Sequence, residues 1–330
     1  MILVSGLPAR ASVALRSVAV TSALVCAAIV VARAEPRPTT AARAGLVSAS
    51  PIESICHLHL RPPIGGEPRF AVPRGGRAVA HPLAGRLLRC SLLRRDGSLF
   101  ASAIRDRLGN VLAIQFFRPG GTLSLSVDPA YPATASTQGA KVSCDSNAEK
   151  SIGSSYWKQP IKWWLGSTPS YLNRDKIVNA LEAAQAEWTN NANYCKYGDQ
   201  ANGSAPYEGK TTHQYGKYDG TNTVDWGSIN SQGCEGAVAC TMNWYDQNGK
   251  PLEADTRFST DYHWSLNPGA QDFDIQSVAA HEFGHVRQFD HVTNADDADY
   301  TDLMWPYTSP GTTNGRKLGR GDSLEDNQHY

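Results

Sequence analysis

Two histidines and a glutamate occur together in the segment HEFGH, residues 281–285, and their spacing suits metal chemistry. His281 and His285 are four residues apart, so on an α-helix of about 3.6 residues per turn they share one face. Two imidazoles on one face can bind one zinc ion. Glu282 follows the first histidine, and a carboxylate beside the metal can act as a general base toward water. The segment therefore predicts a hydrolytic metal site.

A third ligand is expected because a catalytic zinc takes three protein ligands and keeps its fourth position for water. His291 lies ten residues after His281, which is the spacing in the motif H-E-x-x-H-x-x-G-x-x-H. Gln288 stands where that motif has glycine, so we expect it to adopt a positive φ at a cost of about 1 kcal/mol. Zinc binding worth about 10 kcal/mol or more offsets this cost. Asp290 remains an alternative oxygen ligand.

A helix has to hold the first two histidines, and residues 272–289 predict one. Asp274 is suited to cap its N-terminus, and apolar residues recur after it at helical spacing. A plain helix with surface histidines is the alternative. Apolar neighbours such as Val278 and Phe283 argue against that alternative, because they predict a buried helix on which histidine and glutamate need partners.

The rest of the region 151–330 predicts a mixed α+β domain around this helix. A second helix is expected over residues 173–188, where Asn173 can cap the N-terminus and apolar residues follow helical spacing. Strands are expected at 161–165, 222–227, 237–245 and 252–259. All eight tryptophans lie beyond residue 150, so we place a domain boundary there.

The region 35–150 predicts a different kind of structure. Its first twenty residues are rich in Ala, Pro, Thr and Ser and indicate a lead-in segment. Short apolar or alternating segments at 98–104, 111–117 and 122–127, separated by turn sequences, predict a small antiparallel sheet. We find no catalytic set of residues in it. The region is interpreted as a β-rich N-terminal domain or a pro-segment.

The N-terminus has the layout of a secretory signal peptide. Residues 1–17 carry two arginines and no acid, an apolar segment follows over 17–32, and Ala32-Arg33-Ala34 offers a cleavage site. The apolar segment is shorter than the roughly 20 residues of a membrane-spanning helix. We therefore predict that residues 1–34 are removed, with a second such site at 42–44 as an alternative. The mature chain is expected to be secreted, extracellular and monomeric, without a stable membrane anchor.

The cysteines and the charge agree with an extracellular globular protein. Seven cysteines occur, and Cys26 lies in the predicted signal peptide, which leaves six for three disulfides. Proximity along the chain favours the pairs Cys56–Cys90, Cys144–Cys195 and Cys234–Cys240. The chain carries 31 basic and 31 acidic residues, so the composition does not indicate nucleic-acid binding.

Two segments give the sequence a family resemblance. FDIQSVAAHEFGHVRQFDH (273–291) and LMWPY (303–307) resemble the active-site helix and the methionine turn of matrixins, which are metzincin-type zinc proteases. KLGRGDSLEDNQHY (317–330) is similar to their closing helix, and two strand segments are similar to those of secreted bacterial members. The likeness covers about residues 155–330.

The resemblance implies a metzincin-type α+β domain with a mixed twisted sheet, an active-site helix and a C-terminal helix. It implies a zinc endopeptidase that cleaves protein or peptide substrates with a zinc-activated water and Glu282 as general base. Met304 is then the floor beneath the metal, and Tyr307 is a candidate for shaping the specificity pocket. The alternative is a secreted binding protein with a silent protease fold. The intact glutamate argues against that alternative.

Two further features concern latency and calcium. Matrixin pro-regions often carry a cysteine in a P-R-C-G-x-P-D motif that plugs the zinc, and this sequence lacks the motif. Latency through a cysteine is therefore not supported. Matrixins commonly bind calcium, and Asp296, Asp297 and Asp299 form an acidic loop whose oxygens suit Ca²⁺. A solvated cluster of charges is the alternative for this loop.

Overall fold

The computed structural model describes the C-terminal three-quarters of the chain with several gaps. The described residues are 77–83, 87–93, 95–96, 98–105, 111–118, 121–130, 144, 151–152, 155–190, 193, 195–198, 201, 203–229, 234, 236–292 and 302–330. Within these segments, every helix is too short or too polar to cross a membrane.

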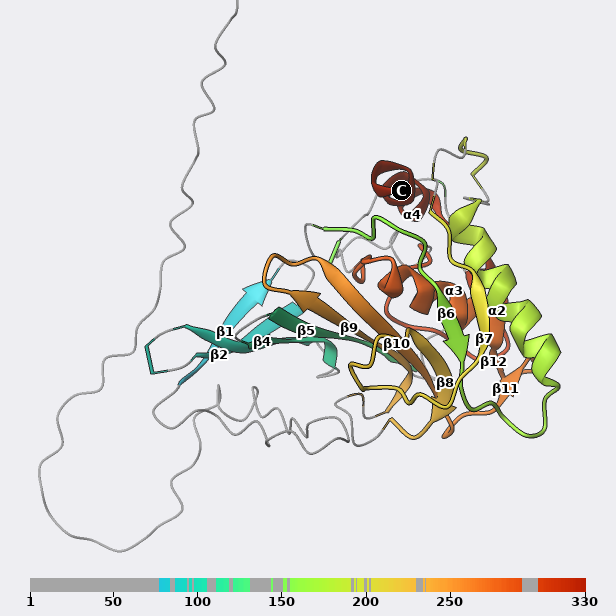
Figure 1. Cartoon of the computed structure of the whole chain (residues 1–330), viewed down its shortest axis with the longest axis horizontal. Coiled ribbons are helices and arrows are strands. Elements are labelled where there is room, and N and C mark those ends of the chain that lie inside the picture. The colour runs from blue at the N-terminus through green and yellow to red at the C-terminus, as the bar shows by residue number, and fades with distance from the viewer. Residues whose placement is uncertain are drawn as a thin grey trace, which may run out of the picture. The chain divides into compact units, whose positions relative to one another are not determined.

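A mixed sheet of ten strands forms the framework of the described residues (Figure 1). Its first five strands are β1 (Arg77–Leu83), β2 (Leu87–Leu93), β3 (Leu99–Arg105), β4 (Val111–Arg118) and β5 (Gly121–Pro129). The others are β6 (Trp163–Leu165), β7 (Tyr207–Lys210), β8 (Thr223–Gly227), β9 (Ala237–Asp246) and β10 (Pro251–Ser259). The strand order across the sheet is β1-β2-β3-β4-β5-β9-β10-β8-β6-β7. A separate pair joins β11 (Trp264–Ser265) to β12 (Phe273–Asp274).

The helices follow from local sequence signals. Helix α2 (Arg174–Thr189) begins after Asn173, whose side chain accepts a hydrogen bond from the Lys176 amide at 3.0 Å. Helix α3 (Ile275–Val286) begins after Asp274, which accepts from the Ser277 amide at 2.9 Å. Both predicted caps are confirmed. The chain continues through the 3₁₀ turn η3 (Asn314–Arg316) to helix α4 (Arg320–His329) at the C-terminus.

Helices α2 and α3 pack together against the half of the sheet that contains β6, β8, β9 and β10 (Figure 1). Large buried side chains fill the space between helices and strands, among them Trp188, Phe258 and Phe283. The indole Nε1 of Trp188 donates to the Ala280 carbonyl at 2.7 Å, which ties α2 to the middle of α3. This buried bond fixes the position of α3 relative to α2. The predicted α+β architecture is confirmed.

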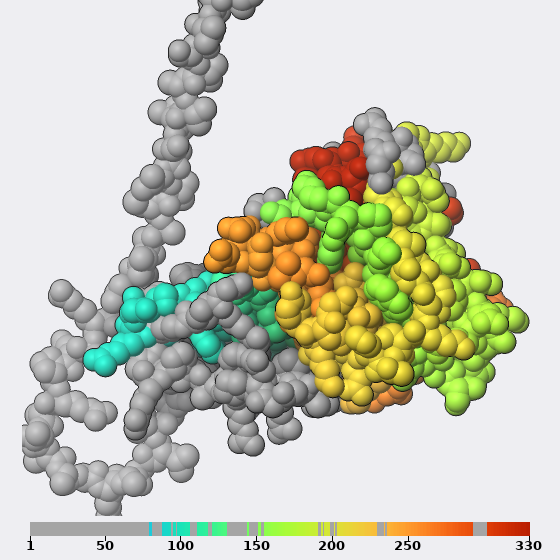
Figure 2. All heavy atoms as spheres, in the orientation of Figure 1, coloured from blue at the N-terminus to red at the C-terminus, as the bar shows by residue number. Residues whose placement is uncertain are grey.

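The N-terminal strands do not form a sheet of their own, although the sequence favoured a small separate one. Strands β1 to β5 pair antiparallel in succession, and β5 then pairs antiparallel with β9. A second group of buried apolar side chains, including Phe116, Leu125 and Met242, packs across this junction. In the space-filling view, the early strands lie directly against the β9–β10 hairpin (Figure 2). The sheet therefore continues across the boundary predicted near residue 150.

Two of the three predicted disulfides are present. Cys144 is bonded to Cys195, and Cys234 is bonded to Cys240. Cys90 on β2 is also disulfide-bonded. Its predicted partner, Cys56, lies outside the described residues.

Candidate metal centre

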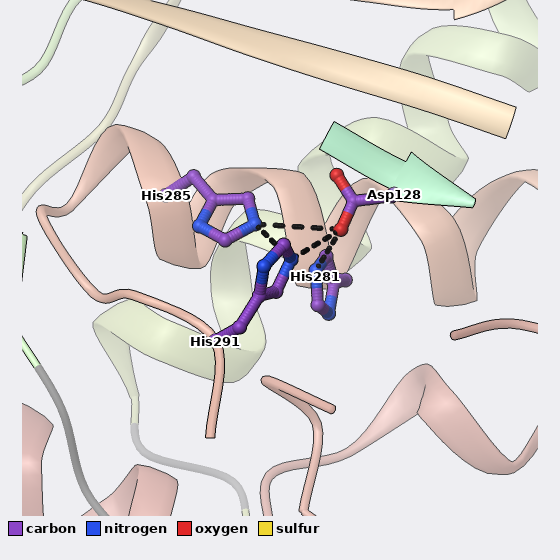
Figure 3. Close-up of side chains that lie close together, drawn as sticks. All are labelled: Asp128, His281, His285 and His291. Carbon is purple, nitrogen blue, oxygen red and sulfur yellow. Dashed lines mark hydrogen bonds and ion pairs between the residues drawn. The ribbon is translucent and has the colours of Figure 1, made fainter. Parts of the chain in front are cut away.

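Four buried side chains converge at the C-terminal part of α3 (Figure 3). His281 and His285 come from that helix, His291 from the segment after it, and Asp128 from the end of β5. The Asp128 Oδ1 atom is 2.7 Å from His281 Nε2, 2.5 Å from His291 Nε2 and 3.5 Å from His285 Nε2. The Nε2 atoms of His285 and His291 are 3.1 Å apart. One nitrogen of each ring and one carboxylate oxygen thus face a common point.

Backbone carbonyls orient two of the three imidazoles. The Nδ1 atom of His281 is 2.6 Å from the Leu303 carbonyl, and that of His285 is 2.7 Å from the Phe289 carbonyl. A carbonyl oxygen can only accept, so each Nδ1 carries the proton. In the neutral ring, Nε2 then presents its lone pair to the centre. Such carbonyl partners commonly fix the orientation of histidines that bind metals.

The donor set fits a metal ion. Zinc binds nitrogen and oxygen ligands at about 2.0–2.1 Å in a tetrahedron, so its ligand atoms lie roughly 3.3 Å from one another. The four separations given above range from 2.5 to 3.5 Å. All four ligand atoms lie within 4.8 Å of one another. Lone pairs and a carboxylate that point at each other in a buried site repel unless a proton or a metal cation lies between them.

The charges in this cluster perturb one another strongly. Burial by itself raises the pKa of Asp128, but the three histidines hold it well below its usual value. Burial lowers the pKa of His281, and the Asp128 charge outweighs that effect and raises it. Burial dominates at His291 and lowers its pKa to about 4. A neutral His291 and an ionised Asp128 are the forms that bind metals.

Glu282 lies on the same helix beside the cluster and is fully buried. Its Oε2 accepts a hydrogen bond from the Thr241 hydroxyl on β9 at 2.6 Å. The hydroxyls of Thr241 and Thr256 are 2.8 Å apart, so a chain of two threonines supports the carboxylate. Burial, and then the nearby Asp128 charge, raise the pKa of Glu282 well above its usual value. The other oxygen, Oε1, has no hydrogen-bond partner among the described residues.

The chain leaves α3 through Gln288, which has a φ of +80°. The expected left-handed conformation at the position of the motif's glycine is therefore confirmed. The Gln288 side chain is buried, and its Nε2 donates to the Asn243 Oδ1 at 3.2 Å and to the Val286 carbonyl at 3.1 Å. These bonds hold the turn that brings His291 back to the cluster. Asp290 stays out of the cluster and accepts from the His291 amide at 2.8 Å.

The methionine turn packs closely against α3, where the Met304 sulfur lies next to Gly284. A Cβ added to Gly284 would lie 2.3 Å from the Met304 sulfur, so only glycine leaves room for it. The carboxylate of Asp322 on α4 accepts from the amides of Leu303 and Met304 at 2.8 and 3.2 Å. It also accepts from the Gly319 amide at 2.7 Å. The C-terminal helix thus fixes the turn that lies under His281.

The remaining predicted residues are not part of the cluster. Tyr307 lies beyond the methionine turn, with its ring 5.9 Å from that of Trp305. The candidate calcium ligands Asp296, Asp297 and Asp299 lie outside the described residues. Sequence reasoning missed Asp128, Asn243 and Asp322. Of these, Asp128 carried a signal only as an acid next to a proline at a strand end, which is a common turn feature.

Three imidazoles and a buried glutamate on and after one helix, above a methionine-bearing turn, define the site of a metalloprotease in an α+β fold. The family model described as Matrixin matches residues 155–325, just over half of the chain. The chain belongs to the matrixin family, whose members are zinc-dependent metalloproteases. No match was found among curated proteins.

Proposed function

We propose that this protein is a secreted zinc endopeptidase in which His281, His285 and His291 hold the metal. The observation that carries the proposal is the convergence of three imidazole nitrogens beside the buried Glu282. When bound, zinc polarises the scissile carbonyl and activates water for attack on it. Belonging to the matrixin family supports peptide bonds as the target.

Proton transfer and the orientation of the ligands are carried out by the protein's own side chains and backbone carbonyls. Glu282 takes a proton from the attacking water and returns it to the leaving nitrogen. Its raised pKa, caused first by burial, suits a group that has to both accept and donate. The Thr241 hydroxyl keeps the carboxylate in place with its 2.6 Å bond. The Leu303 and Phe289 carbonyls hold two of the three imidazoles in orientation.

The wider assignments belong to the same proposal. We propose that residues 1–34 are a signal peptide, that 35–150 are a β-rich N-terminal region or a pro-segment, and that 151–330 are the protease domain. The two disulfides support an extracellular location. We further propose that the protein acts as a monomer and that Tyr307 borders the specificity pocket. Asp296, Asp297 and Asp299 are a candidate calcium site, with a solvated cluster of charges as the alternative.

Metal analysis tests the ligand assignment. The wild-type chain is expected to retain one zinc ion per molecule after dialysis, and His285→Ala to lose it. His291→Ala is expected to lose zinc, whereas Asp290→Ala is expected to keep it. A wild-type chain without zinc, or loss in Asp290→Ala alone, would overturn the assignment. If the zinc-loaded wild-type chain does not cleave casein, and Glu282→Gln behaves in the same way, a binding protein with a silent protease fold would be favoured.

A further inference from the structure

Strand β5 crosses the metal centre as an extended segment. On one side it pairs antiparallel with β9 over its whole length, from Gly121 opposite Asp246 to Pro129 opposite Ala237. On the other side, β5 pairs antiparallel with β4 from Gly121 to Ser126, and the residue after the strand, Ala130, forms a parallel bridge with Thr308, four residues after Met304. Beyond its pairing with β4, the end of the strand that carries Asp128 thus lies between β9 and the segment that follows the methionine turn. Strand addition of this kind is a common way for a protein to hold an extended peptide.

Asp128 gives the centre four protein ligands in place of three. A catalytic zinc site keeps one position open, whereas a site with four protein ligands is closed. The Asp128 carboxylate approaches all three imidazoles and is itself buried, with 3% of its surface exposed. Its Oδ1 would be the fourth ligand of an ion held by the three histidines, because it lies together with their ring nitrogens (Figure 3). In this arrangement, water and a scissile carbonyl are both excluded.

We propose that β5 is a built-in inhibitor, in which Asp128 closes the metal site while the strand fills the peptide-binding groove. The proposal rests on the proposed zinc peptidase function. It gives the N-terminal strands a specific role as a pro-segment, and it supplies latency without a cysteine. Activity then requires that β5 leaves β9.

The strand occupies the groove without offering an ordinary peptide bond to the metal. The Asp128 side chain, rather than its peptide carbonyl, meets the three histidines. The pairing with β9 shifts register between Asp128 and Pro129, so the backbone is displaced at this point. The following nitrogen belongs to proline, whose ring fixes φ. These features let β5 bind in place of a peptide and resist cleavage.

The first experiment compares full-length wild type with Asp128→Ala and Asp128→Asn, and with Asp246→Asn as the control. Asp246 is a partly exposed carboxylate at the far end of the same strand pair, where its oxygen accepts from the amides of Asn248 and Lys250. Zinc affinity is measured by chelator competition, and acetohydroxamate binding by calorimetry on the zinc-loaded chains. Casein cleavage is followed in parallel.

The two affinities are expected to change in opposite directions. Asp128→Ala should bind zinc about tenfold or more weaker because a ligand is lost. It should bind acetohydroxamate about tenfold or more tighter, because the probe no longer competes with a tethered carboxylate. Casein cleavage should rise by at least a similar factor. Asp128→Asn should give values of both affinities between those of wild type and Asp128→Ala. Asp246→Asn should have the affinities of wild type. A merely structural role for Asp128 would weaken both affinities together.

Zinc-loaded Asp128→Ala that binds the probe no tighter than wild type would overturn the inhibitor role and leave the proposed function standing. Absence of zinc from every chain would overturn the proposed function. If Asp128→Ala fails to fold, a specific protease site inserted between residues 136 and 137 replaces it. The Cys144–Cys195 and Cys234–Cys240 disulfides both lie after that cut. Cutting is expected to strengthen probe binding, and an unchanged affinity after complete cutting would equally overturn the inhibitor role.

Discussion

Gln288 is the residue at which this chain departs from the glycine of its motif, and substitutions there test how the third histidine is placed. The residue is fully buried and has a φ of +80°. We consider two substitutions, Gln288→Ala and Gln288→Gly. Both remove the side-chain amide, but only glycine removes the steric cost of the left-handed conformation.

The expected changes in stability follow from the contacts of Gln288. Its Nε2 makes two hydrogen bonds, to Asn243 at 3.2 Å and to the Val286 carbonyl at 3.1 Å, and each contributes about 0.5–1.5 kcal/mol net. Alanine loses both bonds and keeps the strain, so it should be about 2 kcal/mol less stable. Glycine relieves about 1–2 kcal/mol of strain. Against this, glycine makes the unfolded chain more flexible, which lowers stability by about 0.4–1 kcal/mol. Glycine should therefore be about 1 kcal/mol more stable than alanine.

Thermal unfolding at a fixed zinc concentration measures these differences, since bound metal shifts the midpoint by mass action. About 1 kcal/mol corresponds to roughly 2–4 °C in a domain of 150–250 residues. The expected order of midpoints is wild type, then Gln288→Gly, then Gln288→Ala. Gln247→Ala, at an exposed glutamine in the turn between β9 and β10, serves as the control and should match wild type. An alanine variant as stable as the glycine variant would refute the strain argument.

Three other predictions concern packing, a buried ion pair and the metal. Gly284→Ala should lower stability by about 1–3 kcal/mol, because the new methyl group meets the Met304 sulfur; an unchanged urea midpoint would contradict the packing. Arg287 donates to Asp326 at 2.6 and 3.0 Å with both side chains fully buried, so Asp326→Ala should cost about 3–5 kcal/mol. Thermal unfolding checks this, and a loss below 1 kcal/mol would count against a tightly held C-terminal helix. Chelation with EDTA should lower the wild-type midpoint but leave that of His285→Ala unchanged, and equal shifts in both would point to metal bound elsewhere.

Much of the fold was predictable where the signal is local. The caps Asn173 and Asp274 and the apolar spacing after them identify α2 and α3, because a helix forms within one short segment. The three histidines and Glu282 lie within eleven residues, so a single sequence motif identifies all four. The left-handed Gln288 was predictable for the same reason, since its position in the motif already requires the turn.

The site residues that the sequence did not predict are brought together by contacts between distant segments of the chain. Asp128 precedes His281 by 153 residues, and only the pairing of β5 with β9 brings the two together. Strand partners are set by tertiary packing, which alternating apolar residues in one strand do not specify. Asn243 and Asp322 were missed for a related reason. Each supports a backbone turn near the site from another element, through contacts that no spacing in the sequence encodes.

In the proposed mechanism, three histidines hold zinc while Glu282 moves the proton. It is tested most directly by Glu282→Gln introduced into the Asp128→Ala chain, with zinc content and casein cleavage measured on the same samples. We expect one zinc per chain, as in the parent, with cleavage reduced by about 10²-fold or more, because the general base is lost. Cleavage at the parent rate with zinc still bound would contradict the role of Glu282 as the general base.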